Sequence, residues 1–445
     1  MKKVFKFLGV FLLVLILTYS GWYASHGQSL AQTKSQNVQF RGTILAASDA
    51  DMIAGAYANG ILNKVDGIED QVAMIDASNG EPKLVSSIEV SNSVISWPAI
   101  IDWHSKKQLA YVVETRGVHD GESQKMKNVF VDFPTGQKIT VIDYSNKNKP
   151  VILQEKHVGK NLHGVSVNAT GNLLVYTSTE KGKELAVSRL KDGLVQTPYY
   201  FTDSEVVYKK PTDEGFRTVE FHPTLNVIAV NLGNKKVLFF KVEDDGTHIN
   251  LRKVGEGLEV AKKWSVGNWH PSGKYFILTD VAWGNGNLGF LFHGKGKLVS
   301  VGYDDGGNHK VVSKIKVGLS PEGADISPDG QYAVTVNMRR TWAPPSGFWF
   351  VPAKKYSSLS LVKINQETGE LTKLGQDYGF NGALPEDVIF DRESNTLAVA
   401  VYHDREELHP EEGWIDFWEL ENDELINTGK QIKVTRGVHN LLLID

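Results

Sequence analysis

Cysteine is absent from this 445-residue chain. Its absence excludes disulfide bonds, thiolate metal sites, a thiol nucleophile and lipid attachment through cysteine. The fold must therefore rely on a large hydrophobic core, which a chain of this length can bury. A basic stripe is absent as well, and the formal net charge is −4. Binding to nucleic acid is disfavoured, because phosphate contacts need clustered lysine and arginine.

Long stretches with helical periodicity and several catalytic motifs are also missing. The chain contains no Gly-x-Ser-x-Gly elbow, no His-Glu-x-x-His zinc motif and no Cys-x-x-Cys-His haem attachment. The segment Gly284–Gly289 matches a dinucleotide fingerprint by letter. It opens no predicted helix whose N-terminus could meet a phosphate, so it is interpreted as a glycine loop.

An apolar run is present at the N-terminus. Lysines at positions 2, 3 and 6 precede the stretch Phe7–Leu17, and small residues follow at 29–31. This pattern is typical of a cleaved secretory signal, and the alternative is an uncleaved membrane anchor. A spanning helix needs about 20 apolar residues, which favours cleavage. Either alternative predicts an extracytoplasmic protein: periplasmic, secreted or anchored to the cell envelope, with membrane contact only through such an anchor.

The rest of the chain repeats one pattern: a polar residue, an apolar run, a tight turn and a second apolar run. The repeat starts lie 64, 54, 48, 57 and 64 residues apart. A repeat of this length, built of strands and turns, is the signature of a β-propeller. The aligned copies begin at Ala99, His163, Arg217, Ser265, Glu322 and Glu386.

One further blade precedes these copies, which makes seven. Its strands are predicted at Met52–Ala58, Gln71–Ile75 and Leu84–Val90. Its innermost strand is either Thr43–Ala47 or the C-terminal run Val438–Ile444, and the second choice would close the ring without a free edge. We predict an all-β, seven-bladed β-propeller of four-stranded antiparallel blades around a central channel. It spans residues 42–445, after a signal or anchor (1–31) and a polar linker (32–41).

Two turn-and-strand phrases carry a family resemblance. They are Ser327–Val334 (SPDGQYAV) and His270–Phe276 (HPSGKYF). They resemble the seven-bladed propellers grouped with 6-phosphogluconolactonase-like and YVTN-repeat proteins. The resemblance covers most of residues 42–445 and implies the fold. It makes lactonase activity one expectation, although fold alone does not imply function.

The predicted functional face carries the long loops between the second and third strands of the blades. Long loops on a rigid scaffold are where function concentrates. The same face holds the start of every innermost strand. The aligned positions there are nearly all polar but differ in residue type, and His439 or Asn440 is the seventh aligned residue. This divergence indicates a ligand site, and the alternative is solvation of strand ends. The long loops are Arg116–Val131, Trp283–Gly289, Met338–Ser357 and His403–Gly413.

Three residues further along each innermost strand, a second ring of polar residues is expected. These residues either hydrogen-bond between neighbouring blades or line a polar tunnel that holds water or an ion. The aligned residues are Asp102, Ser166, Glu220, Asn268, Asp325 and Ile389.

Two functions remain open from the sequence. The first is an exported binding module that holds a small molecule, a glycan or a partner protein at the channel mouth. The alternative is a lactonase-like hydrolase, with Glu322, Glu386 and His163 in acid–base roles and Arg217 steadying negative charge. The two glutamates and the histidine would also suit a divalent cation such as Ca²⁺, Mg²⁺ or Mn²⁺. A metal-dependent lyase is not singled out by any residue.

The insert of blade 6 offers candidate ligand contacts. Arg339 and Arg340 could clamp a carboxylate or phosphate, and Trp342 offers a stacking face for a sugar or a ring. His439 is the candidate ligand contact from the closing strand. The alternative for the insert is that its aromatic side chains only fasten a long loop.

Overall fold

The computed structural model describes residues 29–34, 38–79, 81–119, 124–203, 215–283, 294–344 and 354–444. The predicted signal or anchor lies almost wholly outside these ranges, as do the glycine loop 284–289 and residues 345–353 of the blade 6 insert. Within these ranges no helix is both long and apolar enough to cross a bilayer.

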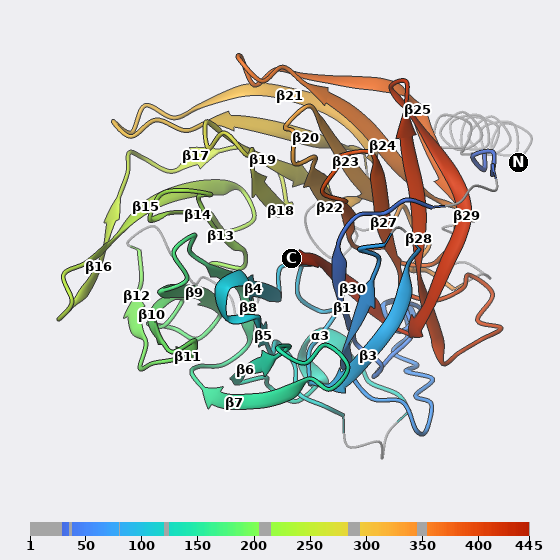
Figure 1. Cartoon of the computed structure of the whole chain (residues 1–445), viewed down its shortest axis with the longest axis horizontal. Helices are drawn as coiled ribbons and strands as arrows, with labels where there is room; N and C mark the ends of the chain where they lie inside the picture. The colour runs from blue at the N-terminus through green and yellow to red at the C-terminus, as the bar shows by residue number, and fades with distance from the viewer. Residues whose placement is uncertain are drawn as a thin grey trace, which may run out of the picture.

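Seven antiparallel sheets stand in a ring around a central channel (Figure 1), which confirms the predicted β-propeller. From the axis outward, blade 1 contains β30 (Val438–Ile444), β1 (Thr43–Ser48), β2 (Gln71–Asp76) and β3 (Lys83–Glu89). Blade 2 contains β4 (Ile101–His104), β5 (Leu109–Val113), β6 (Lys138–Asp143) and β7 (Val151–His157). Blade 3 contains β8 (Leu162–Val167), β9 (Leu173–Ser178) and β10 (Leu185–Lys191), with β11 (Leu194–Val195) and β12 (Tyr199–Phe201) both pairing β10.

The other four blades follow in chain order. Blade 4 contains β13 (Val219–Phe221), β14 (Val227–Leu232), β15 (Lys236–Asp244) and β16 (Ile249–Lys253), with β17 (Leu258–Glu259) also on β15. Blade 5 contains β18 (Trp264–Trp269), β19 (Tyr275–Asp280), β20 (Lys295–Gly302) and β21 (Lys310–Leu319). Blade 6 contains β22 (Pro321–Ile326), β23 (Tyr332–Asn337), β24 (Ser357–Ile364) and β25 (Leu371–Phe380). Blade 7 contains β26 (Val388–Phe390), β27 (Thr396–Val401), β28 (Glu412–Glu421) and β29 (Glu424–Thr435).

The core lies between the blades, on the second strand of each. β9 and β27 are buried at every position, whereas the outer strand β7 is largely exposed. A strand that is covered on both faces reads as a continuous apolar run instead of an alternating one. This explains the runs LLVYTS and TLAVAV, which follow the tight turns of blades 3 and 7.

The two ends of the chain close the ring. β30 is the innermost strand of blade 1 and pairs antiparallel with β1, with Leu442 opposite Leu45. The alternative with β1 innermost is wrong, and so is the strand predicted at Met52–Ala58. Those residues lie in a loop that contains the short helix α2 (Ala56–Asn59), which ends at Gly60 with φ of 72°. That left-handed conformation favours glycine and stops the helix.

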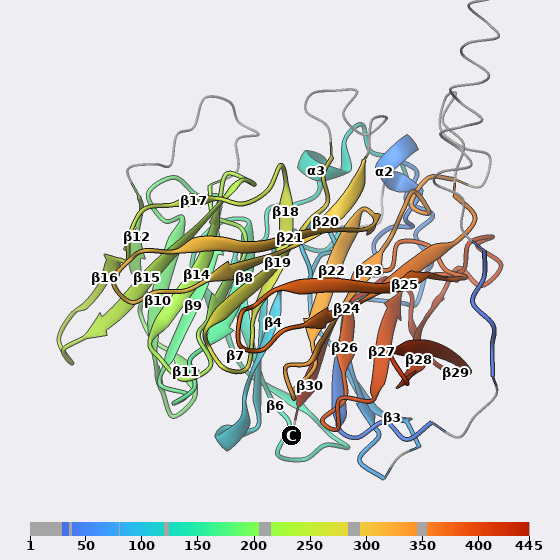
Figure 2. The same ribbon diagram turned by 90° about the horizontal axis from the view of Figure 1, so that it is seen from above.

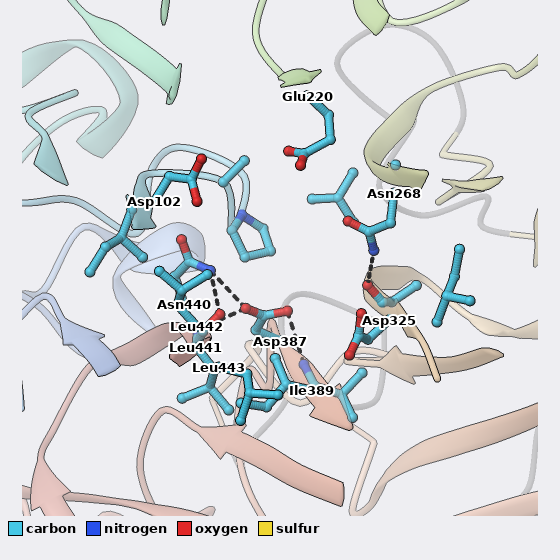
Figure 3. Close-up of a pocket in the computed structure, with 18 of the residues that line it drawn as sticks. Asp102, Glu220, Asn268, Asp325, Asp387, Ile389, Asn440, Leu441, Leu442 and Leu443 are labelled. Carbon is cyan, nitrogen blue, oxygen red and sulfur yellow. Dashed lines mark hydrogen bonds between the residues drawn. The ribbon is translucent and has the colours of Figure 1, made fainter. Parts of the chain in front are cut away.

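Side chains near the axis join each innermost strand to the next. The polar ring predicted three residues along the strands makes these bonds at Asp102, Ser166, Asn268 and Asp325, which confirms the inter-blade interpretation there. Glu220 differs, because its carboxyl group points into the channel (Figure 3). The bonds are Asp102 Oδ2 from Val167 N (2.6 Å), Ser166 Oγ from Phe221 N (3.1 Å), Asn268 Nδ2 to Ala324 O (2.6 Å), Asp325 Oδ2 from Phe390 N (2.8 Å), Asp387 Oδ2 from Leu441 N (2.8 Å) and Asn440 Oδ1 from Ile100 N (2.9 Å).

Histidines at the ends of two innermost strands contact the turn of the following blade. Nε2 of His222 lies 3.1 Å from Gly273 O, and Nε2 of His270 lies 3.0 Å from Gly330 O. Both glycines have positive φ, and a Cβ at either would collide with the imidazole ring. These two histidines and the Pro-Ser-Gly and Pro-Asp-Gly turns are therefore parts of the scaffold.

The end of the predicted signal or anchor and the start of the predicted linker pack against the outside of the ring. Ala31 N donates to Gly379 O at 2.8 Å, and Lys34 N donates to Asn427 O at 2.9 Å. These bonds attach residues 29–34 to β25 and β29, the outer strands of blades 6 and 7. Phe40 is fully buried, and its ring centroid lies 5.6 Å from that of Phe417.

Removal of residues 438–445 should destabilise the whole domain. The truncation removes β30, exposes both neighbours of blade 1 and deletes the buried side chains of Leu441 and Ile444. We expect a loss above about 4 kcal/mol, since each buried aliphatic side chain contributes about 2–5 kcal/mol. Thermal and urea unfolding measure the effect. Removal of residues up to 34 is the control and should have a smaller effect, whereas an unchanged melting temperature without β30 would rule out closure by this strand.

Candidate functional site

A cavity of about 300 Å³ opens at the loop-bearing end of the channel, and is called the mouth cavity below. The short helices α2 and α3 (Val129–Asp132) stand at this end, as Figure 2 shows. The wall combines residues from the starts of innermost strands with residues of the long loops. The loops of blades 2, 5 and 6 contribute Phe130, Trp283 and Trp342. These three loops therefore share one face, as predicted.

Three of the four predicted catalytic residues come together in this wall. Arg217 precedes β13, Glu322 lies in β22 and Glu386 precedes β26, so they come from blades 4, 6 and 7. Lys263, which precedes β18 of blade 5, completes the charged group. The mouth cavity thus contains two carboxyl groups and two cationic groups.

The two glutamates are strongly desolvated. Their residues are only 4% and 1% exposed, and the Oε2 atom of each is buried without a hydrogen-bond partner. Burial raises the pKa of Glu322 to about 8, against the opposing charges of Lys263 and Arg217. Burial, followed by the charge of Glu322, raises the pKa of Glu386 well above its ordinary value. Both carboxyl groups therefore keep their protons to a higher pH than an exposed glutamate does, and the two cations favour the ionised form of Glu322.

Aromatic rings hold the two cations in place. The guanidinium of Arg217 lies 5.1 Å from the centroid of the Trp97 ring, and its Nη2 donates to Ile95 O at 3.2 Å. The ammonium of Lys263 lies 5.5 Å from Trp97 and 4.8 Å from Trp283. A cation over an indole face is attracted by the ring quadrupole, so both charges are positioned beside the glutamates.

His163, the fourth predicted catalytic residue, lies behind the wall. Its Nδ1 is 3.1 Å from Oγ of Ser96, and Ser96 itself lines the mouth cavity. Burial, then the charges of Arg217 and Arg116, hold the pKa of this imidazole well below its ordinary value. His163 is therefore a neutral group that reaches the cavity through Ser96.

The predicted ligand-contact residues do not all reach the mouth cavity. Trp342 lines the mouth cavity, but Arg339, Arg340 and His439 do not. Arg339 is buried and donates from Nη1 to Tyr356 O at 2.8 Å, and Arg340 is fully buried beside it. His439 is fully buried, and its Nε2 lies 2.8 Å from Asn92 Oδ1. The two arginines belong to the interior of the loop, where a buried backbone carbonyl needs a donor.

The predicted cation ligands do not gather around one point. Among the described residues, one group of three acidic or histidine ligand atoms lies within 4.8 Å, and it consists of Asp49, Asp51 and Asp70. Glu322, Glu386 and His163 form no such group. Their arrangement does not fit the hypothesis of a divalent cation shared by all three.

The aspartate group is occupied by the protein itself. Asp49 accepts from the amides of Asp51 and Val94, and Asp70 accepts from Ala50 and Asn92. The Lys64 ammonium lies 3.1 Å from Oδ1 of Asp51. These bonds anchor the loop that follows β1, so the group is explained as a structural cluster. Asp49 and Asp51 follow β1 and Asp70 precedes β2, outside the aligned copies of the repeat, so the repeat pattern gave no signal for this group.

A second cavity of about 290 Å³ lies inside the channel (Figure 3). Carboxyl groups of Asp102, Asp325 and Asp387 line it, and each accepts the amide of the next blade. Burial raises the pKa of Asp102 and of Asp325 to about 6 and that of Asp387 to about 8. The carboxyl groups that line this cavity are therefore explained by the bonds that they make between neighbouring blades.

Sequence reasoning missed Trp97, Lys263 and Leu384, which all line the mouth cavity. Each lies two residues before the start of a repeat copy, at Ala99, Ser265 and Glu386. All three therefore lie just outside the aligned segments, where the chain leads into an innermost strand. Extending the aligned copies by two residues would have found all three.

Comparisons with known proteins give the fold and no closer relationship. Neither protein-family models nor curated proteins match the sequence. Among solved structures, a candidate 6-phosphogluconolactonase from Bacteroides fragilis NCTC 9343 aligns with a TM-score of 0.63 at 16% identity, over 93% of this chain and 100% of that one. A second, from Bacteroides uniformis ATCC 8492, gives 0.62 at 15% identity, over 91% and 100%.

A periplasmic gluconolactonase from Pseudomonas aeruginosa gives a TM-score of 0.61 at 12% identity, over 90% of this chain and 99% of that one. The chain is therefore similar in fold to lactonase-like seven-bladed propellers over about nine-tenths of its length. The resemblance predicted from the turn phrases is confirmed at the level of the fold.

Stability should fall between about pH 4.5 and pH 8, and Glu322→Gln should reduce that fall. The ordinary pKa of 4.5 applies to the unfolded chain and about 8 to the folded one. Between these values the folded state binds more protons, so raising the pH destabilises it. The variant should therefore gain stability over the wild type as pH rises from 5 to 8, on the order of a few kcal/mol. Urea unfolding at both pH values measures it.

Glu421→Gln is the control, because Glu421 is an exposed glutamate on the outer part of blade 7. Its substitution should leave the fall in stability between pH 5 and pH 8 in place. If both variants show the same pH dependence as the wild type, the Glu322 carboxyl is not desolvated in solution.

Proposed function

We propose that the protein binds a small molecule in the mouth cavity and hydrolyses a cyclic ester there, as a lactonase-like enzyme. The observation that carries this proposal is the pair of buried carboxyl groups, Glu322 and Glu386, in one cavity with Arg217 and Lys263. Unsatisfied buried carboxyl oxygens are costly to a fold. Groups with strongly shifted pKa values that face a cavity are candidates for acid–base catalysis.

The two carboxyl groups differ in a way that suits ring opening. Glu322, whose ionisation both cations favour, is the general base, and in its ionised form it takes a proton from water. The water oxygen attacks the lactone carbonyl carbon, and Arg217 and Lys263 stabilise the oxyanion. Glu386, which holds a proton, donates it to the ring oxygen as the carbon–oxygen bond breaks. The product is a hydroxy acid, and proton exchange with water restores both glutamates.

Ser96 and His163 support this arrangement from behind. The neutral imidazole fixes the Ser96 hydroxyl at the cavity wall, 3.1 Å away. Because the imidazole is neutral, it adds no third cation to Arg217 and Lys263. The two carboxyl groups are then the pair that changes protonation state.

A second candidate function is binding without catalysis. The observation that favours it is the set of aromatic rings around the mouth cavity, including Trp97, Trp283 and Trp342. Aromatic walls grip small molecules and glycans by stacking and burial. A binding protein of this kind would hold its ligand against the same cations and leave it unchanged.

Export is part of the proposal. The N-terminal lysines and apolar run support an extracytoplasmic protein, and one solved structure of similar fold is a periplasmic gluconolactonase. Nucleic acid is not an expected partner, given the net charge of −4. Fractionation of cells that express the full chain tests the compartment, and recovery in the cytoplasm would overturn this part.

Purified protein should open simple lactones at rates above buffer. Glu322→Gln and Glu386→Gln should each lower kcat by about 10²-fold or more, the scale of losing a positioned acid or base. Titration of released acid at constant pH measures turnover. Glu421→Gln, on the outer part of blade 7, is the matched control and should retain full activity.

The outcomes separate the candidate functions. Turnover equal to buffer, together with calorimetric binding of an uncleaved ligand, would favour the binding protein. Loss of turnover in EDTA would show that a cation takes part and would overturn the mechanism with two carboxyl groups alone.

A further inference from the structure

The wall of the mouth cavity is mostly apolar. Of the fourteen described residues that line it, nine have aliphatic, thioether or aromatic side chains. The polar remainder is Ser96, Arg217, Lys263, Glu322 and Glu386. Four of these five belong to the charged group that the proposed hydrolysis uses on the lactone carbonyl and ring oxygen. The body of the substrate is therefore left with almost purely apolar surroundings.

The polar edges of the wall are already engaged within the protein. Trp283 Nε1 donates to Ser320 Oγ at 3.0 Å, and Tyr57 Oη donates to Val94 O at 3.2 Å. Oγ of Ser96 lies within hydrogen-bond distance of His163 Nδ1. These three groups are therefore taken up by the protein, whereas Nε1 of Trp97 is buried without a partner and is one donor that a ligand could meet. Apart from this donor and the charged group, the described wall offers mainly ring and aliphatic carbon.

The aromatic rings form two pairs around the space. Trp97 and Trp283 have centroids 6.0 Å apart with an interplanar angle of 60°, and Tyr57 and Phe130 have centroids 5.3 Å apart at 33°. Paired, tilted rings of this kind pack well against a flat apolar body. The cavity volume of about 300 Å³ is at the small end for ligand sites, which suits one ring beside the lactone.

A sugar lactone fits these surroundings poorly. It carries several hydroxyl groups that would lose their bonds to water, and outside the charged group the described wall offers them few partners, among them Nε1 of Trp97. A buried donor or acceptor that is left unpaired is penalised strongly, and sites without matching polar groups discriminate against such ligands.

We propose that the substrate is a lactone with an aromatic or otherwise flat, apolar body, and that sugar lactones are excluded. This inference rests on the proposed lactone hydrolysis and names its substrate class. This class differs from the sugar lactones that the names of the similar structures indicate.

The test uses three lactones with the same ester chemistry and different bodies. Dihydrocoumarin carries a fused aromatic ring, δ-valerolactone has no additional body, and δ-gluconolactone carries hydroxyls. For the full-length protein, kcat/KM for dihydrocoumarin should exceed that for δ-gluconolactone by about 100-fold or more, after subtraction of the rate in buffer. δ-Valerolactone should fall between them.

Variants of the wall test the cause of that preference. Trp342→Ala and Phe130→Ala should raise KM for dihydrocoumarin by about tenfold or more, with little effect on δ-valerolactone. Trp342→Phe keeps an aromatic face and should retain the preference, even if the alanine variant unfolds. Leu153→Ala, on the outer strand β7, is the surface control. Melting temperatures show which variants are folded.

A binding measurement keeps the inference separate from the reaction. The lactam analogue of dihydrocoumarin is not hydrolysed and should bind Glu322→Gln in calorimetry, whereas gluconolactam should not. Hydrolysis of δ-gluconolactone at an equal or higher kcat/KM would overturn the inference and leave the proposed function standing. No turnover of any lactone would overturn the proposed function. Binding of the aromatic lactam would then still support the selectivity of the wall, and absence of binding would overturn that as well.

Discussion

The pairing of β30 with β1 is the constraint on which the rest of the structure depends. It makes the last strand of the chain the innermost strand of the first blade. Once this strand is in place, Asp387 accepts the amide of Leu441 and Asn440 accepts the amide of Ile100. The side-chain bonds between innermost strands then join blade 7 to blade 1 and blade 1 to blade 2. A ring that is closed in this way has no sheet edge at the axis and cannot open at one blade without breaking its neighbours.

A rigid ring explains how the mouth cavity tolerates its charges. Glu322 and Glu386 come from neighbouring blades, so their proximity is fixed by the spacing of the blades and not by either segment alone. Burying the two carboxyl groups lowers the stability of the folded state when they are ionised, and the raised pKa values reflect this loss of stability. Strain of this kind persists where the surrounding structure over-determines it. The cores between the blades, with second strands buried on both faces, supply that surrounding structure.

The sequence predicted the number of blades and the convergence of Arg217, Glu322 and Glu386, because both follow from the repeat. It offered the C-terminal run as one of two alternatives for the innermost strand of blade 1. It was wrong about Met52–Ala58, which was predicted to be a strand. These residues lie in a loop that Asp49 and Asp70 anchor by accepting hydrogen bonds from backbone amides. It placed Arg339 and Arg340 at a ligand, although their charge and loop position fit equally well with burial inside the loop. The direction of a long side chain in an irregular loop depends on carbonyls from elsewhere in the fold, and these carry no local signal. The turn phrases predicted the family of folds correctly but belong to the scaffold, as the contacts of His222 and His270 show.

Carboxyl groups near the axis serve two different purposes, and the partners of their oxygens decide which. Asp102 and Asp325 each accept an amide 65 residues further along the chain, in the next blade, and so tie the ring together. Glu322 lies only three residues before Asp325 on the same strand, yet its Oε2 meets no donor and its neighbours are cations. Two carboxyl groups that are three residues apart on β22 thus have different roles. That of Asp325 bonds neighbouring blades, and that of Glu322 faces the site of the proposed reaction. Residue type alone does not reveal the distinction, because both are acidic residues in an apolar strand, but their positions in the aligned repeat differ. The role of each carboxyl group follows from its position along the channel axis. In the middle of the channel it meets backbone amides of the next blade, and at the mouth it meets side chains from the loops.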